Sequence, residues 1–297
     1  MECLVLRVDA FTKVIGQGNP AGVVLNGDQY STKEMQEIAK KVGFNETAFC
    51  CSSDHADIKL RYFTPGHETP LCGHATMGSI FALYHGKGNQ KRVIETKAGL
   101  LSVDYNDEQC EITMTQAEPK FIDFTGDKKA LCRSLGIEKT DLDPSLPIQY
   151  GNTGSWTLLV PVKNETVLDK MSADTQCFPE LLTEIPKASV HPFTVLSKEA
   201  AMMTARHFSS PFSGTKEDSV TGTASGVMGA YALNHIYLDD QRKEITVFQG
   251  KHVNRSGQVL VDVIRGEKAA HSVRITGTAC LNEEIKITLD EKKTRQN

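Results

Sequence analysis

The hydrophobic pattern of the chain changes twice in the same way. Residues 68–86 open on the acid Glu68 and residues 217–235 on the acids Glu217 and Asp218. Each segment then passes through Gly, Thr and Ser and becomes apolar on all sides, with no further Lys, Arg, Asp or Glu before Lys87 and Asp239. A helix without a polar face must be covered all round. Each segment therefore predicts a loop that leads into a buried helix.

The two segments also align residue by residue. When Gly73 is set against Gly222, Glu68 meets Glu217. Small residues let other backbone approach the first helical turn, whose free N–H groups and dipole attract anions. The pattern favours a site in which two helix N-termini hold a substrate carboxylate or phosphate. Two ordinary core helices with packing glycines are the alternative interpretation.

Other landmarks recur in the same order. RYFTP at 61–65 is echoed by RHFSSP at 206–211, and GLLSVDY at 99–105 by GQVLVDV at 257–263. The short alternating strands fit regular βαβ winding poorly and predict a barrel-like sheet wrapped on each buried helix. We therefore predict two duplicated halves, with the site in the cleft between them. Residues 1–125 would form the N-terminal half and 126–297 the C-terminal half, with crossover of the terminal segments left open.

The N-terminal region contains two further signals. The glycines between residues 16 and 22 resemble a dinucleotide-binding loop, but the residues that follow Pro20 predict a strand where that motif needs a helix. Ser31 and Glu34 form a capping box before an amphipathic helix that runs to Val42 and ends at Gly43.

A candidate acid/base lies in FNETAFC, residues 44–50. The alternation is that of a strand and places Glu46 on the same face as Phe44 and Ala48. Burial on an apolar face would raise the pKa of this carboxyl, which suits a general acid/base. A solvated face, or a turn at Glu46, stays open as the alternative.

Composition narrows the class of protein. A net charge of −4 and a pI near 6.2 give no basic field for nucleic acid or for an anionic membrane. The chain has no uncharged run suited to crossing a membrane and no signal peptide, so we expect a cytoplasmic protein. The eight cysteines form no C-x-x-C motif and no zinc-type spacing, so we expect reduced, buried thiols and no metal.

Several motifs together carry a resemblance to a known family. DAF…GNPAGVV, FNETAF, RYFTP, LCGHAT, EDSVTGTASG and QGKHVNRSG closely resemble the PhzF-like (phenazine biosynthesis-like) family, relatives of diaminopimelate epimerase, over essentially the whole chain. The resemblance implies an α+β fold of the diaminopimelate epimerase type, with two pseudo-twofold-related β-barrel halves, each wrapped on a central helix, and a homodimer. It also implies a cofactor-independent isomerase without a metal, which moves a proton between carbons of a small carboxylate substrate.

The resemblance assigns roles to individual residues. Glu46 becomes the proton shuttle in the cleft between the halves, while His74 and Asp218 contact and orient the substrate. The resemblance also implies that Gly73, Gly222 and Thr223 bind the substrate carboxylate. The chain departs from the family pattern at Ser219, Thr223 and Ser225, where Pro, Ser and His are common. Thr223 keeps a hydroxyl, but its methyl group narrows the pocket.

Two other functions stay open. A two-base amino-acid epimerase of the related type would use two opposed thiols, one before each helix glycine. Cys72 occupies the first of these positions, but Thr221 occupies the second, and a threonine hydroxyl is too weak an acid to replace a thiolate. Cys72 is then interpreted as a small buried apolar residue. The third possibility is a non-catalytic small-molecule-binding protein with the same fold.

Overall fold

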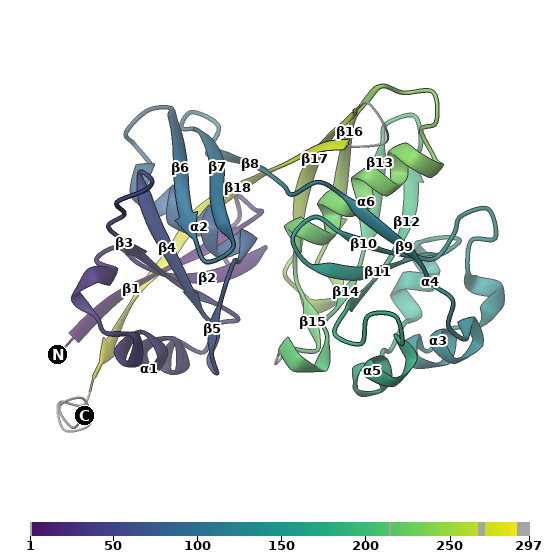
Figure 1. Ribbon diagram of the computed structural model, residues 1–297, viewed down its shortest axis with the longest axis horizontal. Helices are drawn as coiled ribbons and strands as arrows, with labels where there is room; N and C mark the ends of the chain where they lie inside the picture. The colour runs from purple at the N-terminus through teal and green to yellow at the C-terminus, as the bar shows by residue number, and fades with distance from the viewer. Residues whose placement is uncertain (1, 214, 267–270, 290–297) are drawn as a thin grey trace. The chain divides into compact units, whose positions relative to one another are not determined.

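The computed structural model describes residues 2–213, 215–266 and 271–289 and contains two compact units (Figure 1). The first unit comprises the chain up to residue 114 and from 277 onward, and the second comprises 115–276. The boundary expected after residue 125 therefore lies inside the second unit. The reason is that strand β9 (Lys120–Asp123) pairs with β10 (Gln149–Asn152) and so ties this segment to the second unit.

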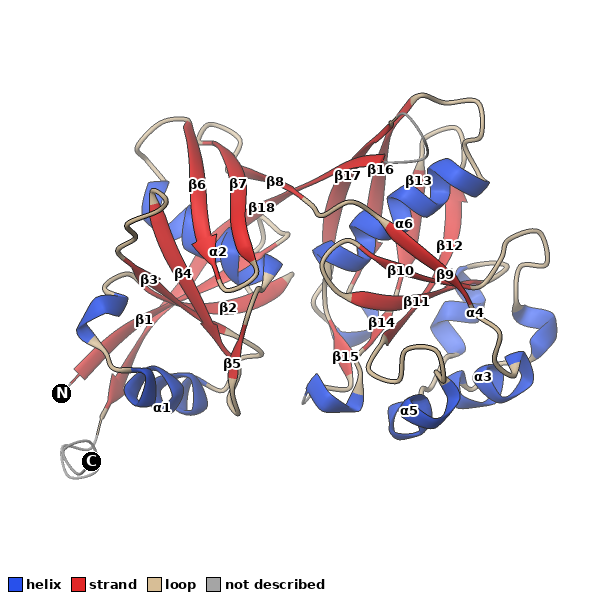
Figure 2. Cartoon of the chain, viewed as in Figure 1, coloured by secondary structure: helices blue, strands red, loops and turns tan. Residues whose placement is uncertain are grey.

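The first unit is a sheet curled on one helix (Figure 2). Strand β1 pairs with β2, β2 runs parallel to β3, β3 pairs with β4, and β4 runs parallel to β6, which continues through β7 to β8. Its elements are β1 (Glu2–Ala10), β2 (Asn19–Val24), η1 (Gly27–Gln29), α1 (Thr32–Val42), β3 (Thr47–Cys51), β4 (Ile58–Phe63), β5 (Glu68–Thr69), α2 (Gly73–Tyr84), β6 (Gln90–Thr96), β7 (Gly99–Asn106) and β8 (Glu111–Thr115).

Helix α1 confirms the predicted start and stop signals. The Ser31 side chain accepts a hydrogen bond from the Glu34 N–H, and the Glu34 carboxylate accepts one from the Ser31 N–H in return. Gly43 ends the helix with φ +74°, a left-handed conformation that glycine adopts without steric cost.

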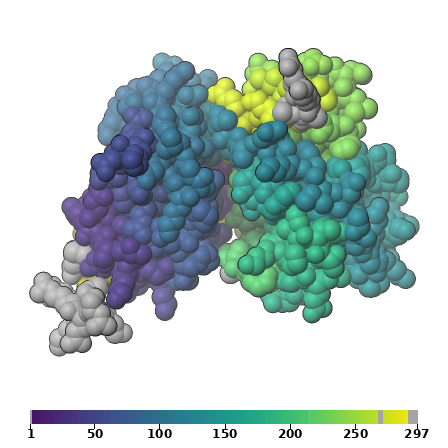
Figure 3. Space-filling model, viewed as in Figure 1, coloured from purple at the N-terminus to yellow at the C-terminus, as the bar shows by residue number. Residues whose placement is uncertain are grey.

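Helix α2 is buried from His74 to Phe81, as its lack of a polar face predicts. A Cβ at Gly78 would lie only 3.3 Å from Val8 Cβ, so the glycine allows the helix to approach strand β1 closely. On the face shown in Figure 3, the atoms of the first unit, coloured purple to blue, form a continuous surface.

The second unit repeats this plan. Its strands surround α6, and Gly229 permits close contact with β17, because a Cβ there would lie 2.6 Å from Val261 Cγ1. The remaining elements are α3 (Lys128–Leu135), η2 (Lys139–Asp141), β11 (Trp156–Pro161), α4 (Glu165–Lys170), η3 (Thr175–Cys177), α5 (Phe178–Leu181), β12 (Ser189–Ser197), β13 (Met202–Ala205), β14 (His207–Phe208), η4 (Pro211–Ser213), β15 (Glu217–Asp218), α6 (Gly222–His235), β16 (Arg242–Gln249), η5 (Lys251–Val253) and β17 (Gly257–Arg265).

Two features distinguish the second unit from a plain repeat. An apolar cluster that includes Leu131, Leu168 and Phe178 packs α3, α4 and α5 against strand residues such as Leu158. The long strand β18 (His271–Thr288) then pairs with β17 in the second unit and continues along β1 of the first. Among the described helices, none is long and apolar enough to cross a membrane.

Candidate active site

The first unit brings together two of the predicted site residues. Glu46 directly precedes β3, and His74 is the second residue of α2. His74 Nε2 lies 3.2 Å from Glu46 Oε2, and the two side chains are 9% and 21% exposed. A carboxylate and an imidazole therefore meet at the N-terminal end of the buried helix and remain partly open to solvent.

The predicted strand alternation around Glu46 is wrong. The strand begins at Thr47, and all five of its residues are buried, so neither of its faces is a polar one. Strand β3 lies between β2 and β4, and its residues are buried on both sides of the sheet. Glu46 lies just before the strand, and its carbonyl accepts a hydrogen bond from Gly22 N–H at 3.1 Å.

The predicted pKa shift of Glu46 is also wrong in sign. Burial alone raises the pKa of the carboxyl, but the hydrogen bond and positive charge of His74 outweigh it, so the pKa is lowered. Burial lowers the pKa of His74, but contacts with Cys72 and Glu46 raise it well above 6.5. Because Cys72 is protonated at neutral pH, the Glu46 carboxylate is the anion that stabilises the imidazolium.

Cys72 is a third member of this cluster. Burial and the charge of Glu46 raise the pKa of its thiol to about 11, so it is a poor base at neutral pH. Its Sγ lies 3.4 Å from His74 Nδ1 and 3.8 Å from Nε2. Such similar distances place the sulfur beside the ring rather than in line with either nitrogen lone pair.

The same three residues form a potential set of metal ligands. One ligand atom from each of Glu46, Cys72 and His74 lies within 4.8 Å of the others, and O, S and N donors together suit Zn²⁺. The position of the sulfur beside the imidazole means that the ring would have to rotate before it could share a cation with Cys72.

The second unit contains the remaining predicted residues. Asp218 ends β15, and its Oδ2 accepts a hydrogen bond from Thr221 Oγ1 at 2.6 Å. Gln249 Nε2 donates to the Asp218 carbonyl at 2.8 Å, and Gln249 Oε1 accepts from Thr221 N–H at 3.2 Å. Sequence reasoning missed Gln249, although it opens the motif QGKHVNRSG. Thr221, at the position of a second thiol, here donates to a carboxylate.

The two helix N-termini resemble each other. The N-cap residues Cys72 and Thr221 make no side-chain capping hydrogen bond, so neither side chain occupies the N–H groups of the first turn. Gly222 is buried and Thr223 is half-buried, with the methyl carbon of Thr223 within 3.4 Å of a Cβ placed on Gly154. Anion binding at Gly73, Gly222 and Thr223 stays a prediction.

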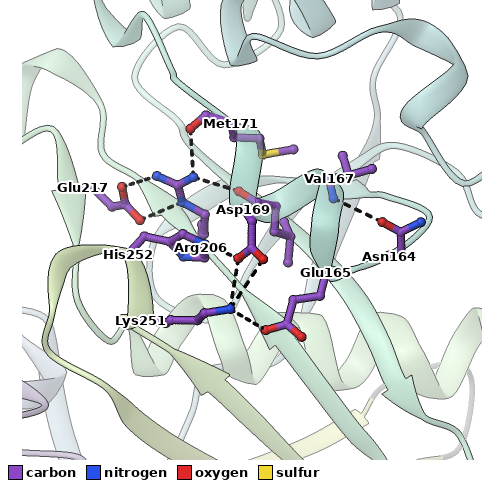
Figure 4. A network of polar contacts seen from close by, with 10 residues as sticks. Asn164, Glu165, Val167, Asp169, Met171, Arg206, Glu217, Lys251 and His252 are labelled. Carbon is purple, nitrogen blue, oxygen red and sulfur yellow. Dashed lines mark hydrogen bonds and ion pairs between the residues drawn. The ribbon is translucent and has the colours of Figure 1, made fainter.

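A forked ion pair precedes each helix. In the first unit, Arg61 Nε and Nη2 donate to the two oxygens of Glu68 at 2.8 and 3.1 Å. In the second, Arg206 Nε and Nη2 donate to Glu217 at 2.9 and 2.7 Å. Arg206 Nη1 also donates to the backbone carbonyls of Leu168 and Met171, at 2.8 and 2.9 Å (Figure 4). These bonds fix β15, and with it Asp218, to α4.

Comparison with known proteins identifies the class. The chain is 48% identical to the "Uncharacterized isomerase YfhB" of Bacillus subtilis, over 95% of this chain and 97% of that protein. It is 25% identical to the trans-2,3-dihydro-3-hydroxyanthranilate isomerase of Pseudomonas chlororaphis, over 84% of this chain and 86% of that protein. The crystal structure of a Bacillus anthracis phenazine biosynthesis protein of the PhzF family matches with TM-score 0.93 and 46% identity, over 97% and 100% of the two chains.

The fold and these relatives define an isomerase with an α+β, diaminopimelate epimerase-like fold. Residues 8–284 match the family PhzC-PhzF, "Phenazine biosynthesis-like protein". The chain belongs to this family, as its motifs predicted, and it acts on a small molecule.

Proposed function

We propose that the protein is a cofactor-independent isomerase that moves a proton between two carbons of a small carboxylate substrate, with Glu46 as the single acid/base. The observation that carries this proposal is the contact of 3.2 Å between Glu46 and His74 at the N-terminus of α2. The pair keeps Glu46 ionised, which is the form that a base needs before it receives a proton.

The proposed reaction needs one proton and no redox partner. The Glu46 carboxylate takes a proton from one carbon and becomes a carboxylic acid, while the electron pair of the broken C–H bond moves into the unsaturated system of the substrate. The electron density then increases at a second carbon, which receives the same proton from Glu46. The positive charge of His74 stabilises the negative charge that develops between these two steps.

Asp218 would orient the substrate through its polar groups. Its carboxylate is held by Thr221 and its backbone by Gln249, which supports a fixed orientation. We further propose that the substrate carboxylate binds to N–H groups at Gly73, Gly222 and Thr223. The substrate of the Pseudomonas chlororaphis relative is the first compound to test, because it is a small carboxylate. By the family resemblance, we also propose a homodimer, which light scattering would check.

The properties of Cys72 favour one base over two. A thiol with a pKa of about 11 contributes little thiolate at neutral pH, and Thr221 donates its hydroxyl proton to Asp218. A two-base epimerase would need both positions to exchange protons with the substrate.

Reaction in D₂O tests the proposal. Wild-type protein is incubated with trans-2,3-dihydro-3-hydroxyanthranilate and with a panel of unsaturated small carboxylates, and the products are followed by NMR. We expect migration of a double bond, with the transferred hydrogen or solvent deuterium at the receiving carbon on the face that the proton left. Inversion at one carbon, with the double bonds unchanged, would refute the isomerase assignment in favour of epimerisation.

A further inference from the structure

Two buried histidines stand in the same strand row as Asp218. Val190 of β12 pairs with Phe208 of β14 in antiparallel register, so His191 is opposite His207. His207 is in turn opposite Asp218 of β15. Residues directly opposite each other on antiparallel strands place their side chains on the same face, with Cβ atoms roughly 4.5–5.5 Å apart. The register therefore aligns two imidazoles with the carboxylate.

The two imidazoles form one hydrogen bond. His191 Nδ1 lies 3.1 Å from His207 Nδ1, and the residues are 0% and 7% exposed. Burial lowers the pKa of both rings, so both are neutral near pH 7. A neutral imidazole has one donor and one acceptor nitrogen. One ring must therefore carry its proton on Nδ1 and the other on Nε2.

The buried surroundings decide between these two arrangements. His191 Nε2 is buried and has no hydrogen-bond partner among the described residues. A buried N–H group without an acceptor is rarer and costs more than an unmatched acceptor. The proton of His191 then belongs on Nδ1, which donates to Nδ1 of His207. His207 is left with its proton on Nε2.

We propose that His207 is a positioning residue for Asp218: the His191 donor fixes His207 as the Nε2–H tautomer, and this N–H group faces the Asp218 carboxylate. The carboxylate already accepts a hydrogen bond from Thr221 Oγ1, and a second donor from another strand would fix the plane of the carboxylate. The inference rests on the proposed function only for the role of Asp218 toward substrate.

The first unit supplies an internal contrast. By the same register, the positions of His191 and His207 hold Ala48 and Tyr62, and the residue opposite Tyr62 is Thr69, which has no charge. The Tyr62 hydroxyl is instead 2.7 Å from Thr76 Oγ1, inside the core. The imidazole pair therefore occurs in the second unit, where β15 ends in the carboxylate Asp218, and not in the first unit, where β5 ends in Thr69.

Nitrogen-15 NMR of the protein labelled at histidine tests the tautomers directly. Long-range ¹H–¹⁵N spectra at pH 7 should show His191 with a protonated Nδ1 and an unprotonated Nε2, and His207 with the opposite pattern. Asp218→Asn should shift the His207 Nε2 resonance. The matched control is Asp169→Asn, which removes a carboxylate 2.8 Å from His252 Nε2 and should shift His252 but neither ring of the pair.

Variants at His191 separate positioning from simple packing. His191→Asn keeps an N–H donor near the Nδ1 position and should preserve the His207 tautomer, whereas His191→Leu should let His207 exchange between both tautomers. A proton on Nε2 of His191, or a His207 spectrum that Asp218→Asn leaves unchanged, would overturn the inference. These spectra need no substrate and therefore test the His207 tautomer alone. The isomerase proposal is tested separately by turnover, and full turnover in Glu46→Gln would contradict it without affecting the tautomer result.

Discussion

The two units share a scaffold but differ in chemistry. Each has a buried helix with an uncapped N-terminus and a forked Arg–Glu pair before it. In the first unit, Glu46, Cys72 and His74 surround that N-terminus. By strand register and helix alignment, the matching residues of the second unit are Ser189, Thr221 and Thr223.

The difference shows which features belong to the fold and which to the reaction. The ion pairs recur because each holds a short strand that leads into the helix, and both units need that strand. The Glu46–His74 pair occurs in one unit, and Asp218 stands where the first unit has Thr69. A duplicated scaffold with one acid/base fits a proton that leaves and returns on one face of the substrate.

Substitution of Glu46 should have the largest effect. Glu46→Gln keeps the side-chain volume but cannot carry a proton, so turnover should fall by roughly 10²–10⁴-fold, the usual contribution of a general acid/base. Ser189→Ala changes the matching position of the second unit and should leave turnover within about threefold of wild type. Steady-state kinetics on one substrate measures both. Equal losses in the two variants would remove the asymmetry from which we infer a single base.

The two ion pairs should differ in their contribution to stability. Arg206→Met leaves the largely buried Glu217 carboxylate, 12% exposed, without its partner and removes the donor to two backbone carbonyls, so the free energy of unfolding should fall by about 3–5 kcal/mol. Arg61→Met should cost less, roughly 1.5–3 kcal/mol, because Arg61 is more exposed and Glu68 keeps its contact with Lys97. Urea unfolding with circular dichroism compares them, and a larger loss for Arg61→Met would contradict this ranking.

Local repetition in the sequence was enough to predict much of the fold. The aligned segments around Gly73 and Gly222 both form buried helices, and the echo of RYFTP marks matching strands with matching ion pairs. Helix α3 follows β9 and has no counterpart in the first half, while α4 and α5 stand where the first half has the single helix α1, between two parallel strands. Their cluster depends on contacts with β11 and β12 that no local pattern contains.

The site was less predictable, because its properties come from tertiary contacts. The sequence places Glu46 beside apolar neighbours and so predicts a raised pKa, but the charge that lowers it comes from His74 on another element. Gln249 lies 28 residues from Thr221 in the chain, and nothing in its neighbourhood predicts their hydrogen bond. The motif QGKHVNRSG marked the segment without indicating what it contacts.

Removal of His74 should reduce stability in a pH-dependent way. The raised pKa of His74 means that its contribution is complete below pH 6.5 and is lost as the pH rises through the higher folded-state pKa. The lowered pKa of Glu46 means that its contribution is complete above pH 4.5 and is lost as the pH falls through the folded-state value. His74→Asn should therefore cost most between these values, about 1.5–3 kcal/mol. Urea unfolding from pH 4 to 9 measures it, and a constant difference would rule out the ion pair.

The smallest effect is expected at Cys72, where a substitution makes the first unit more like the second. Cys72→Thr places at this N-cap the residue that the second unit has at Thr221. If the thiol only packs beside the His74 ring, Cys72→Thr and Cys72→Ala should both retain turnover within about threefold. Each should lower the free energy of unfolding by about 1 kcal/mol, because a buried side chain changes size or polarity. Kinetics and urea unfolding of the same samples test this. A loss of turnover by several orders of magnitude in both variants, with stability preserved, would make Cys72 a second base and would favour the epimerase.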